Sequence, residues 1–443
     1  VGDSTPISTD YLKEFGSSEG FGAHLIAIVS EGERGRLYVS PDSTHQSAAL
    51  LPRPEGAPEQ ELPHEPRAIW TPLYGLKRHS DLFTNRQLLA MVTFSDLISE
   101  VRERVKREAT KAAMEPGLGS DASDTGALAY ADAVATYLAL AVSRLADYSS
   151  SVCTWNNARD GIRNVFARQA IPMAWDFAEA NPFSSSSGSF LGQVDWVCRA
   201  LNHTPSAPTG DARQMPAQSR QYTEMVVSTD PPYYDNIGYS DLSDYFYVWL
   251  RRSLKPVFPE LTRYLTVPKS EELIASPYRH DKDEKAADRF FLDGMTEAMS
   301  SLEKQSNAKF PAAIYYAFKQ SEVEQEGIAS TGWATFLQAV LDSGQSVVGT
   351  WPVRTERDTG LKAGMNVLAN SVVMVCRNRP ASAETITRAE FIRALKRELP
   401  PAIAELQAAN VSPADMPQSA IGPGMGVFSR YKAVLEADDS PMT

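Results

Sequence analysis

The chain has 443 residues, of which 43% are hydrophobic and 22% are charged. This length and this balance of residue types exclude a fibrous or wholly disordered protein and predict two or three packed domains. The formal net charge of -12 differs from the basic balance of autonomous nucleic-acid-binding modules, so any contact with nucleic acid is expected to be local.

Apolar runs and cysteines bear on where the protein works. Runs such as Val134 to Val142 are shorter than the roughly 18 residues of a membrane span, so no membrane is expected as a partner. Cys153, Cys198 and Cys376 form no C-x-x-C pair and no secretory signal is found, which favours a reducing cytoplasm. The first residue is valine, so we expect the chain to be part of a longer protein.

Residues 1–70 are predicted to form a small β element followed by a proline-rich connection. Within residues 24–39, apolar β-branched runs flank the turn "EGERG", which is typical of two paired strands. The stretch "PRPEGAPEQELPHEP" follows, and its prolines continue neither a sheet nor a helix.

Residues 71–204 are predicted to be mainly helical. Apolar residues recur at helical spacing from Asp81 to about Ala113 and from Gly126 to Ala146. A further helical pattern runs from Asp160 to Ala180, with a kink or a break expected at Pro172.

Residues 205–380 show short apolar strands that alternate with helices. Strands are predicted at "EMVVST", "AAIYYAF", "SVVGTWPV" and "SVVMVC", and helices at "SDYFYVWLRRSL", "KAADRFFLDGMTEAMSSLEKQ" and "WATFLQAVLDSG". This alternation predicts the α/β class, with a sheet covered by helices on both faces. Residues 381–443 are predicted to be a helical C-terminal tail with a Pro/Gly-rich end.

The sequence "TDPPYYD" follows the first of these strands and is the main candidate site. Ligands of open α/β sheets bind beyond the carboxyl ends of strands, and Asp230 is expected at the carboxyl end of a central parallel strand, with Tyr233 facing an open cleft. Its carboxylate and the Pro231 carbonyl, whose direction proline presets, would accept the N–H bonds of an exocyclic base amine and aim its lone pair at a methyl donor. Tyr233 would stack on the extruded base. The alternative is an ordinary strand-to-turn Asp-Pro followed by core tyrosines.

Asp230-Pro231-Pro232-Tyr233 resembles the fourth motif of amino-group DNA methyltransferases, and its aspartate looks like the adenine-N6 subgroup. Longer stretches are similar to a family of large adenine-specific DNA methylases that have an N-terminal domain of unknown function and often lie among prokaryotic defence genes. These stretches are residues 67–98, 135–156, 166–188, 229–254 and 421–443. The resemblance implies that residues 205–380 form a partial Rossmann-like methyltransferase sheet after a mainly helical N-terminal region. It also implies S-adenosylmethionine as cofactor and DNA as partner.

The resemblance implies a place for part of the cofactor. Amino methyltransferases often hold the adenine of S-adenosylmethionine with a Gly-Asp pair before the motif strand, and Gly210-Asp211-Ala212 is in the matching place. The alternative for these residues is a polar turn. A glycine-rich turn after a first strand is also required, yet "EFGSSEGFGAHLIAIV", "GPGMG" and "SSSSGSFLG" each lack a preceding strand. In the resembled family this turn lies upstream, so we expect an upstream part of the same enzyme as partner.

The function predicted on this basis is methyl transfer to the N6 amine of adenine in DNA. Two alternatives stay open: a DNA-binding or assembly module that transfers no methyl group, and methylation of RNA or of a protein glutamine through a related pocket. Cytosine-C5 methylation is disfavoured because each cysteine follows valine instead of proline. The six histidines show no ligand spacing, so no metal site is expected.

Several further residues have more than one interpretation. Asp235 and Asn236 either line the base pocket or cap the helix that starts near Ser240. Capping is expected of Ser240 and Asp241, and the role of Asp235 is left open. The loop from Arg354 to Asn366 joins two strands that are predicted to be antiparallel. This loop and Lys319, at the end of another strand, are weaker candidates for DNA contacts than for exposed positions. Aromatic residues at helical or strand spacing are expected in the core, namely Phe246, Tyr247, Trp249, Tyr315 and Tyr316.

Overall fold

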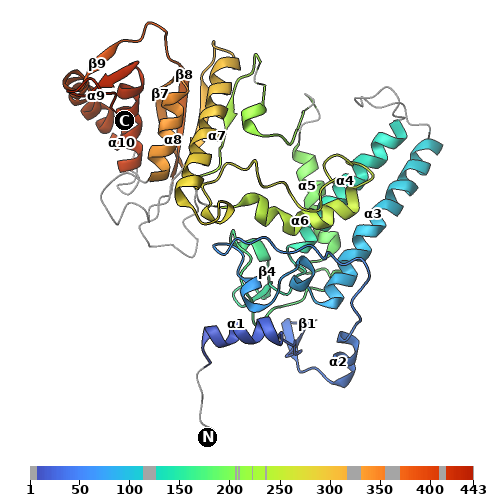
Figure 1. The fold of residues 1–443 in the computed structure, drawn as a ribbon. Coiled ribbons are helices and arrows are strands. Elements are labelled where there is room, and N and C mark those ends of the chain that lie inside the picture. Colours follow the sequence, from blue (N-terminus) through green and yellow to red (C-terminus); the bar gives the residue numbers. More distant parts are fainter. Residues whose placement is uncertain are drawn as a thin grey trace. The chain divides into compact units, whose positions relative to one another are not determined.

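A computed structural model describes residues 7–112, 126–204, 207, 210–221, 223–234, 237–316, 331–354, 370–408 and 416–442 (Figure 1). The chain divides into two compact units, each assembled from two stretches of sequence. Unit 1 comprises Val1–Ala212 and Gly238–Ser270, and unit 2 comprises Arg213–Ile237 and Glu271–Thr443. This division differs from the four predicted segments, because residues 238–270 pack with the helical part of the chain.

Unit 1 is mainly helical, as predicted. Its long helices are α3 (Asn85–Lys111), α4 (Gly126–Ala146), α5 (Phe190–His203) and α6 (Tyr239–Leu254). Helix α4 contacts the other three. It buries alanines every fourth residue at positions 127, 131, 135 and 139. Small side chains along one stripe allow neighbouring helices to approach closely.

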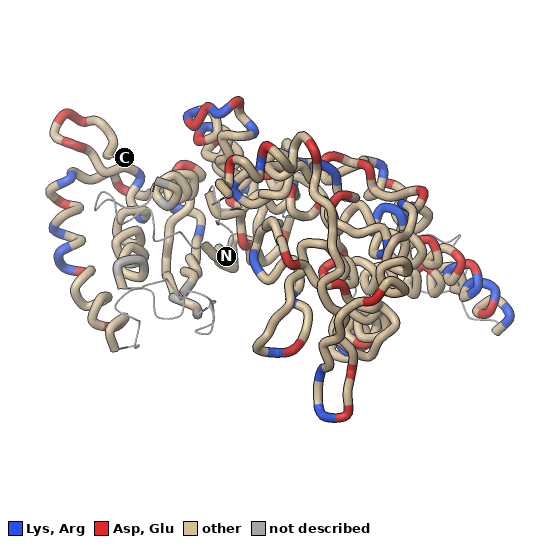
Figure 2. The backbone as a smooth tube through the Cα atoms, turned by 90° about the horizontal axis from the view of Figure 1, so that it is seen from below, with Lys and Arg blue, Asp and Glu red and all other residues tan. Residues whose placement is uncertain are grey.

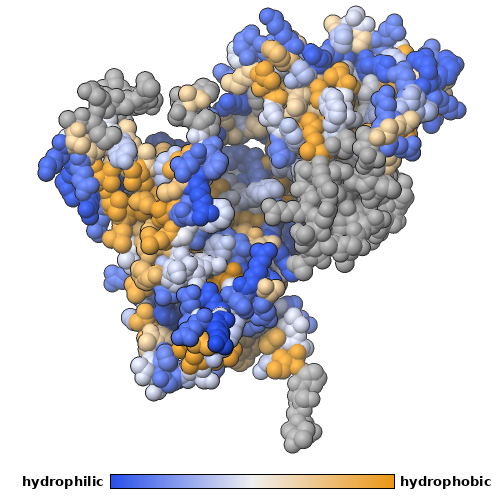
Figure 3. Space-filling view, turned by 180° about the vertical axis from the view of Figure 1, so that it is seen from behind, coloured by the Kyte–Doolittle hydropathy of each residue, from blue (hydrophilic) through white to orange (hydrophobic). Residues whose placement is uncertain are grey.

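Helix α4 is long and apolar enough to cross a membrane by length and composition, with 44% of its most apolar window buried. A helix in the core of a globular protein can have the same length and composition. Exposed apolar side chains of α3 and α4 include Leu89, Leu97, Tyr137 and Leu140. Figure 3 shows hydrophobic surface over this helical part. The absence of a membrane partner therefore stays a prediction.

The amino-terminal part of unit 1 contains the expected pair of strands. Strands β1 (Ile28–Gly32) and β2 (Gly35–Val39) pair antiparallel. They lie between two helices that the sequence did not predict, α1 (Thr9–Ser18) and α2 (Ser43–Ala49). Short 3-10 turns follow at Thr71–Tyr74 and His79–Leu82.

The predicted helix from Asp160 to Ala180 is wrong. Strand β4 (Gly161–Arg163) instead pairs antiparallel with β3 (Thr154–Asn156), and a 3-10 turn follows at Val165–Ala167. Bridges of Ile171 with Ile69 and of Phe177 with Thr154 satisfy further backbone groups of this stretch. Backbone groups that pair across the fold in this way do not need the local bonds of a helix.

Unit 2 contains a mixed four-stranded sheet, which confirms the α/β class. Its strands are β5 (Ser228–Thr229), β6 (Ala312–Tyr316), β7 (Gln345–Arg354) and β8 (Asn370–Asn378). They lie in the order β5-β6-β8-β7. Strand β5 is parallel to β6, whereas β8 is antiparallel to both β6 and β7, the latter as the sequence predicts.

Three helices pack against one face of this sheet: α7 (Glu284–Gln305), α8 (Thr331–Asp342) and α10 (Met416–Ser429). The sheet residues buried with them alternate along β6 and β8 and include Ile314, Tyr316, Val372, Met374 and Cys376. On the alternate face, Tyr315, Trp351 and Val353 are 37%, 56% and 40% exposed. The described helices therefore do not cover both faces as predicted, because this core forms on one side only.

The tail is helical, as predicted, with α9 (Arg388–Ala408) and a small parallel pair of strands, β9 (Thr385–Thr387) and β10 (Ala433–Leu435). Its Pro/Gly-rich end forms α10. A Cβ atom on Gly422 would lie 2.0 Å from the Thr350 hydroxyl oxygen on β7. The "GPGMG" glycine at position 422 thus permits close packing of a helix on a strand.

Candidate functional site

Asp230 directly follows β5, at the carboxyl end of that strand, where the sequence places it. The expectation of a central strand is wrong, however, because β5 is an edge strand of the described sheet and only two residues long. The pairing of β5 with β6 is parallel, as expected. The Asp230 side chain is exposed, so it is accessible to a ligand.

The motif passes from the exposed carboxylate into the core within a few residues. Pro231 is buried, while Pro232 and Tyr233 are half-buried. The Tyr233 ring meets Tyr316 edge-on, with ring centroids 5.3 Å apart, and Tyr316 stacks on Phe336 at 4.0 Å. Tyr233 therefore contacts the core with one part of its ring and is half-exposed, and its place in an open cleft stays a prediction.

Asp230 and Tyr233 are coupled directly. Partial burial by neighbouring atoms raises the pKa of the Asp230 carboxyl, and a hydrogen bond from the Tyr233 side chain opposes this rise. The hydroxyl thereby helps to keep the carboxylate ionised. This role of the Tyr233 hydroxyl was not predicted from the sequence, which treated the ring alone as functional.

Tyr234 anchors the loop from three directions. Its backbone N–H donates to the Tyr316 hydroxyl at 3.2 Å, and its carbonyl accepts from the Ala275 N–H at 2.8 Å. Its own hydroxyl is hydrogen-bonded to Asp288 on α7. A Cβ atom on Gly332, in the first turn of α8, would lie 2.7 Å from Tyr234, so the helix approaches closely there. These contacts hold the loop in place.

Sequence reasoning missed most of these anchors. The doublet of tyrosines gave a signal for an aromatic loop, and Tyr316 is in the core as predicted, whereas Tyr315 is partly exposed. The contacts of Tyr234 with Ala275 and Asp288 join segments more than 40 positions apart, and no local pattern announces them.

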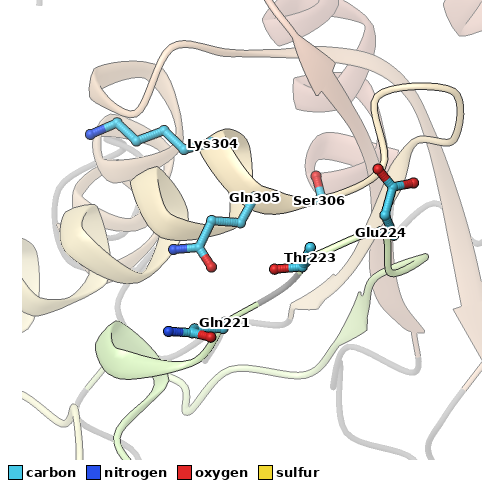
Figure 4. Close-up of a pocket in the computed structure, with 6 residues that line it drawn as sticks. All are labelled: Gln221, Thr223, Glu224, Lys304, Gln305 and Ser306. Atoms are coloured by element: carbon cyan, nitrogen blue, oxygen red, sulfur yellow. The ribbon is translucent and has the colours of Figure 1, made fainter.

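Described residues of unit 2 line at least two pockets. A 540 Å³ pocket lies between the segment before β5 and the end of α7, and Figure 4 shows its lining residues. These are Gln221, Thr223, Glu224, Lys304, Gln305 and Ser306. The first three precede β5 and the last three precede β6, which is parallel to β5, so this pocket is at the strand end opposite Asp230. A second pocket, of 440 Å³, is lined by Lys285, Asp288 and Arg289 near the start of α7.

The residues expected at the cofactor do not form a pocket with one another. Gly210, Asp211 and Ala212 are exposed in an irregular segment of unit 1, and a Cβ atom on Gly210 would meet no atom within 4 Å. Gly16 in α1 and Gly422 in α10, glycines of two other candidate stretches, pack closely against neighbouring segments. The described residues therefore do not fit S-adenosylmethionine by themselves, and the cofactor role of residues 210–212 stays a prediction.

The remaining described candidates lie in helix α6. The N-cap of α6 is Gly238, without a side-chain cap, so the expected capping by Ser240 and Asp241 is wrong; both lie inside the first turn. Trp249 is buried in unit 1, as predicted, while Phe246 and Tyr247 are half-buried. Further candidates fall outside the described residues, namely Asp235, Asn236, Lys319 and positions 355–366 of the loop.

Comparisons with protein-family models, with curated proteins and with solved structures find no match to this chain. The methyltransferase resemblance therefore stays a prediction from the residues of the chain.

Proposed function

We propose that residues 230–233 hold the exocyclic N6 amine of a target adenine, and that the chain is the base-binding part of a DNA adenine methyltransferase with a Rossmann-like sheet. The observation that carries this proposal is the exposed Asp230 carboxylate at a strand end, hydrogen-bonded by Tyr233. A rigid loop with one exposed acceptor suits a site that must orient a small polar group.

The chemistry follows from the two acceptors. The amine nitrogen of adenine is a weak nucleophile, because its lone pair is delocalised into the ring. Hydrogen bonds to the Asp230 carboxylate and to the Pro231 carbonyl would favour a tetrahedral nitrogen, whose lone pair is localised. The ring of Tyr233 would replace part of the stacking that the base loses when it leaves the duplex. The core behind Tyr316 keeps these groups in position.

S-adenosylmethionine would supply the methyl group. Because the described residues do not form its pocket, we propose that an upstream part of the same enzyme, bearing the glycine-rich turn, completes the cofactor site in a reducing cytoplasm. This gap is also what favours the second candidate function, a DNA-binding module that transfers no methyl group. Methylation of RNA or of a protein glutamine would use the same acceptors on another substrate.

A radiolabelled methyl-transfer assay tests the proposal. The chain alone is expected to show no measurable methylation of an adenine-containing duplex, and an upstream segment with the glycine-rich turn is expected to restore it. In the restored enzyme, Asp230→Ala should lower turnover about a hundredfold or more, because it removes an acceptor that acts in the transition state. The control is Asp293→Ala, which removes an exposed carboxylate from α7.

Each outcome separates the candidates. An unchanged rate in Asp230→Ala would contradict the proposed site. Binding of the duplex without any methylation, even with the upstream segment, would favour the module without methyl transfer. Methylation of RNA or of a glutamine peptide in place of the duplex would redirect the proposal to that substrate.

A further inference from the structure

The second pocket of unit 2 is connected to the motif loop. It is lined by Lys285, Asp288 and Arg289, which occupy successive turns near the start of α7. Asp288 accepts a hydrogen bond from the hydroxyl of Tyr234, the residue that follows Tyr233 in the chain. Asp288 of this pocket is therefore connected to Tyr233, the candidate base-stacking residue, through Tyr234.

The pocket carries an excess of positive charge. Lys285 and Arg289 are exposed, and the ion pairs found among the described residues include neither of them. Arg289 Nε donates to the Lys285 carbonyl at 3.3 Å, which leaves the remaining guanidinium N–H groups free of that bond. The one carboxylate between them, Asp288, accepts from Tyr234.

Acidic residues outnumber basic residues in the chain as a whole. Basic and acidic positions are interspersed along the backbone in Figure 2, and the net charge is -12. Nearby Arg279 pairs with Glu272 at 2.8 Å, and such pairing leaves little charge to attract an anion. Lys285 and Arg289 lie one helical turn apart, and their two charges outnumber the single carboxylate of Asp288, so the pocket lining has a net charge of +1 (2 - 1) that attracts an anion.

We propose that Lys285 and Arg289 bind a backbone phosphate of the DNA strand whose adenine is held at residues 230–233, an inference that rests on the proposed function. A flipped base stays attached to its backbone, so a base pocket needs phosphate contacts beside it. Arginine binds phosphate through two parallel N–H bonds, and lysine adds a point charge. The Tyr234 hydroxyl on Asp288 fixes the distance between the two parts of the site.

The test is the salt dependence of DNA binding by the full chain. The probe is a fluorescent duplex with one mismatched adenine, titrated with the chain at several potassium chloride concentrations. Each phosphate contact contributes about 0.9 to the slope of log affinity against log salt. The double variant Lys285→Ala/Arg289→Ala gives up one phosphate contact and should lower this slope by about 0.9, so between about 50 and 200 mM salt its affinity should fall roughly three- to fourfold less than that of wild type.

Two further variants sharpen the reading. Lys304→Ala removes a lysine from the opposite end of the same helix and should leave the slope unchanged. Asp288→Asn keeps an acceptor for Tyr234 but removes the negative charge, so it should raise the affinity for the duplex. A purely structural role for Asp288 would instead give an unchanged or lower affinity.

The outcomes distinguish the two proposals. A wild-type slope in the double variant overturns the phosphate site, whether or not Asp230→Ala affects methyl transfer. A reduced slope in the double variant, together with an unchanged methylation rate in Asp230→Ala, supports the phosphate site and overturns the proposed function. Failure of the wild-type chain to bind the duplex at low salt overturns both.

Discussion

The two units bury different kinds of polar side chain. Among the described residues, the buried acidic and histidine side chains, Glu65, His79, Asp241 and Asp244, all lie in unit 1. The buried polar side chains of unit 2 are serines and a glutamine, such as Ser276, Gln345 and Ser429. In unit 2, the cluster shared by α7, α8 and the sheet is almost wholly apolar, and the motif carboxylate stands outside it.

A buried ion pair is an example of the charged groups inside unit 1. In unit 1, Asp244 is 1% exposed and accepts from Lys269 at 2.6 Å and from the Val267 N–H at 2.7 Å. Burial raises the pKa of Asp244, and the bonds to Lys269 and Val267 counteract this. Burial raises the pKa of a thiol to about 12 in both units, at Cys153 and at Cys376, so the thiols do not distinguish them. The comparison teaches that unit 1 buries groups whose charge depends on pH, whereas the serines and glutamine buried in unit 2 carry no charge.

The largest effect is expected from a cavity in the core of unit 2. Phe291 is fully buried on α7 and meets Tyr234 edge-on at 5.2 Å. Phe291→Ala should lower the free energy of unfolding by about 3 to 5 kcal/mol. Denaturant unfolding followed by hydrogen exchange over unit 2 measures the loss. Phe310→Ala, at a position that is half exposed, is the matched control and should cost far less.

Acid should destabilise unit 1 almost as strongly. Burial, with the Lys269 charge, lowers the pKa of His79 from 6.5 to about 4. The unfolded chain therefore binds a proton that the folded chain excludes, and stability falls as the pH drops from 6.5 towards 4. The loss is about 3 kcal/mol at 1.36 kcal/mol for each pH unit. Unfolding measured at pH 7 and at pH 4 tests this.

Variants separate His79 from the other groups that titrate in acid. His79→Gln should remove this part of the pH dependence, whereas His203→Gln, at an exposed histidine of unit 1, should leave it in place. An equal pH dependence in wild type and His79→Gln would show that the contrast between the units does not rest on this histidine.

Two glycine-to-alanine substitutions, one in each unit, compare the effect of adding a methyl group at a packed and at an open position. A Cβ atom on Gly422 would collide with Thr350, whereas Gly210 has open space around it. Gly422→Ala should cost about 1 to 3 kcal/mol from overpacking, offset by about 1 kcal/mol of helix propensity. Gly210→Ala should change stability by less than about 0.5 kcal/mol. Thermal unfolding of both variants compares them, and equal shifts would contradict the close approach of α10 to β7.

The smallest effect is expected at the Tyr233 hydroxyl. Tyr233→Ala should weaken binding of a mismatched adenine by roughly 1 to 3 kcal/mol, the usual value of a base–aromatic stack, and Tyr233→Phe should retain most of that binding. Loss of the hydroxyl bond should raise the pKa of Asp230 further. The acid limb of the methylation rate should then move to higher pH in Tyr233→Phe. Identical pH profiles would argue against the coupling of these two residues.

The spacing of apolar residues correctly predicted those helices and strands whose buried face can be recognised within the element itself. Helices α4, α7 and α8 and the antiparallel strands β7 and β8 appear where their apolar spacing indicates. The position of Asp230 at the end of a strand was also predictable, because an apolar run precedes it. These features need only the residues within one element.

Features that depend on distant partners could not be predicted in this way. Residues 160–180 have a helical pattern, yet Ile69 and Thr154 pair with them. Helix α6 follows the motif in sequence but contacts α3 and α4. The bond from Tyr234 to Asp288 joins positions 54 residues apart. Tertiary pairing decides each of these cases, and a single sequence does not display it.

The shortness of β5 has a consequence for accuracy. Only two residue pairs, Ser228 with Ala313 and Thr229 with Ile314, align this strand with its neighbour. A slip by one position would turn Asp230 to the opposite side of the sheet, since successive side chains alternate. Two pairs give little resistance to such a slip, so the hydrogen bonds of Tyr234 to Tyr316 and Ala275 fix the alignment instead. Tyr234 therefore sets the register that places Asp230, four positions before it, on the correct side of the sheet.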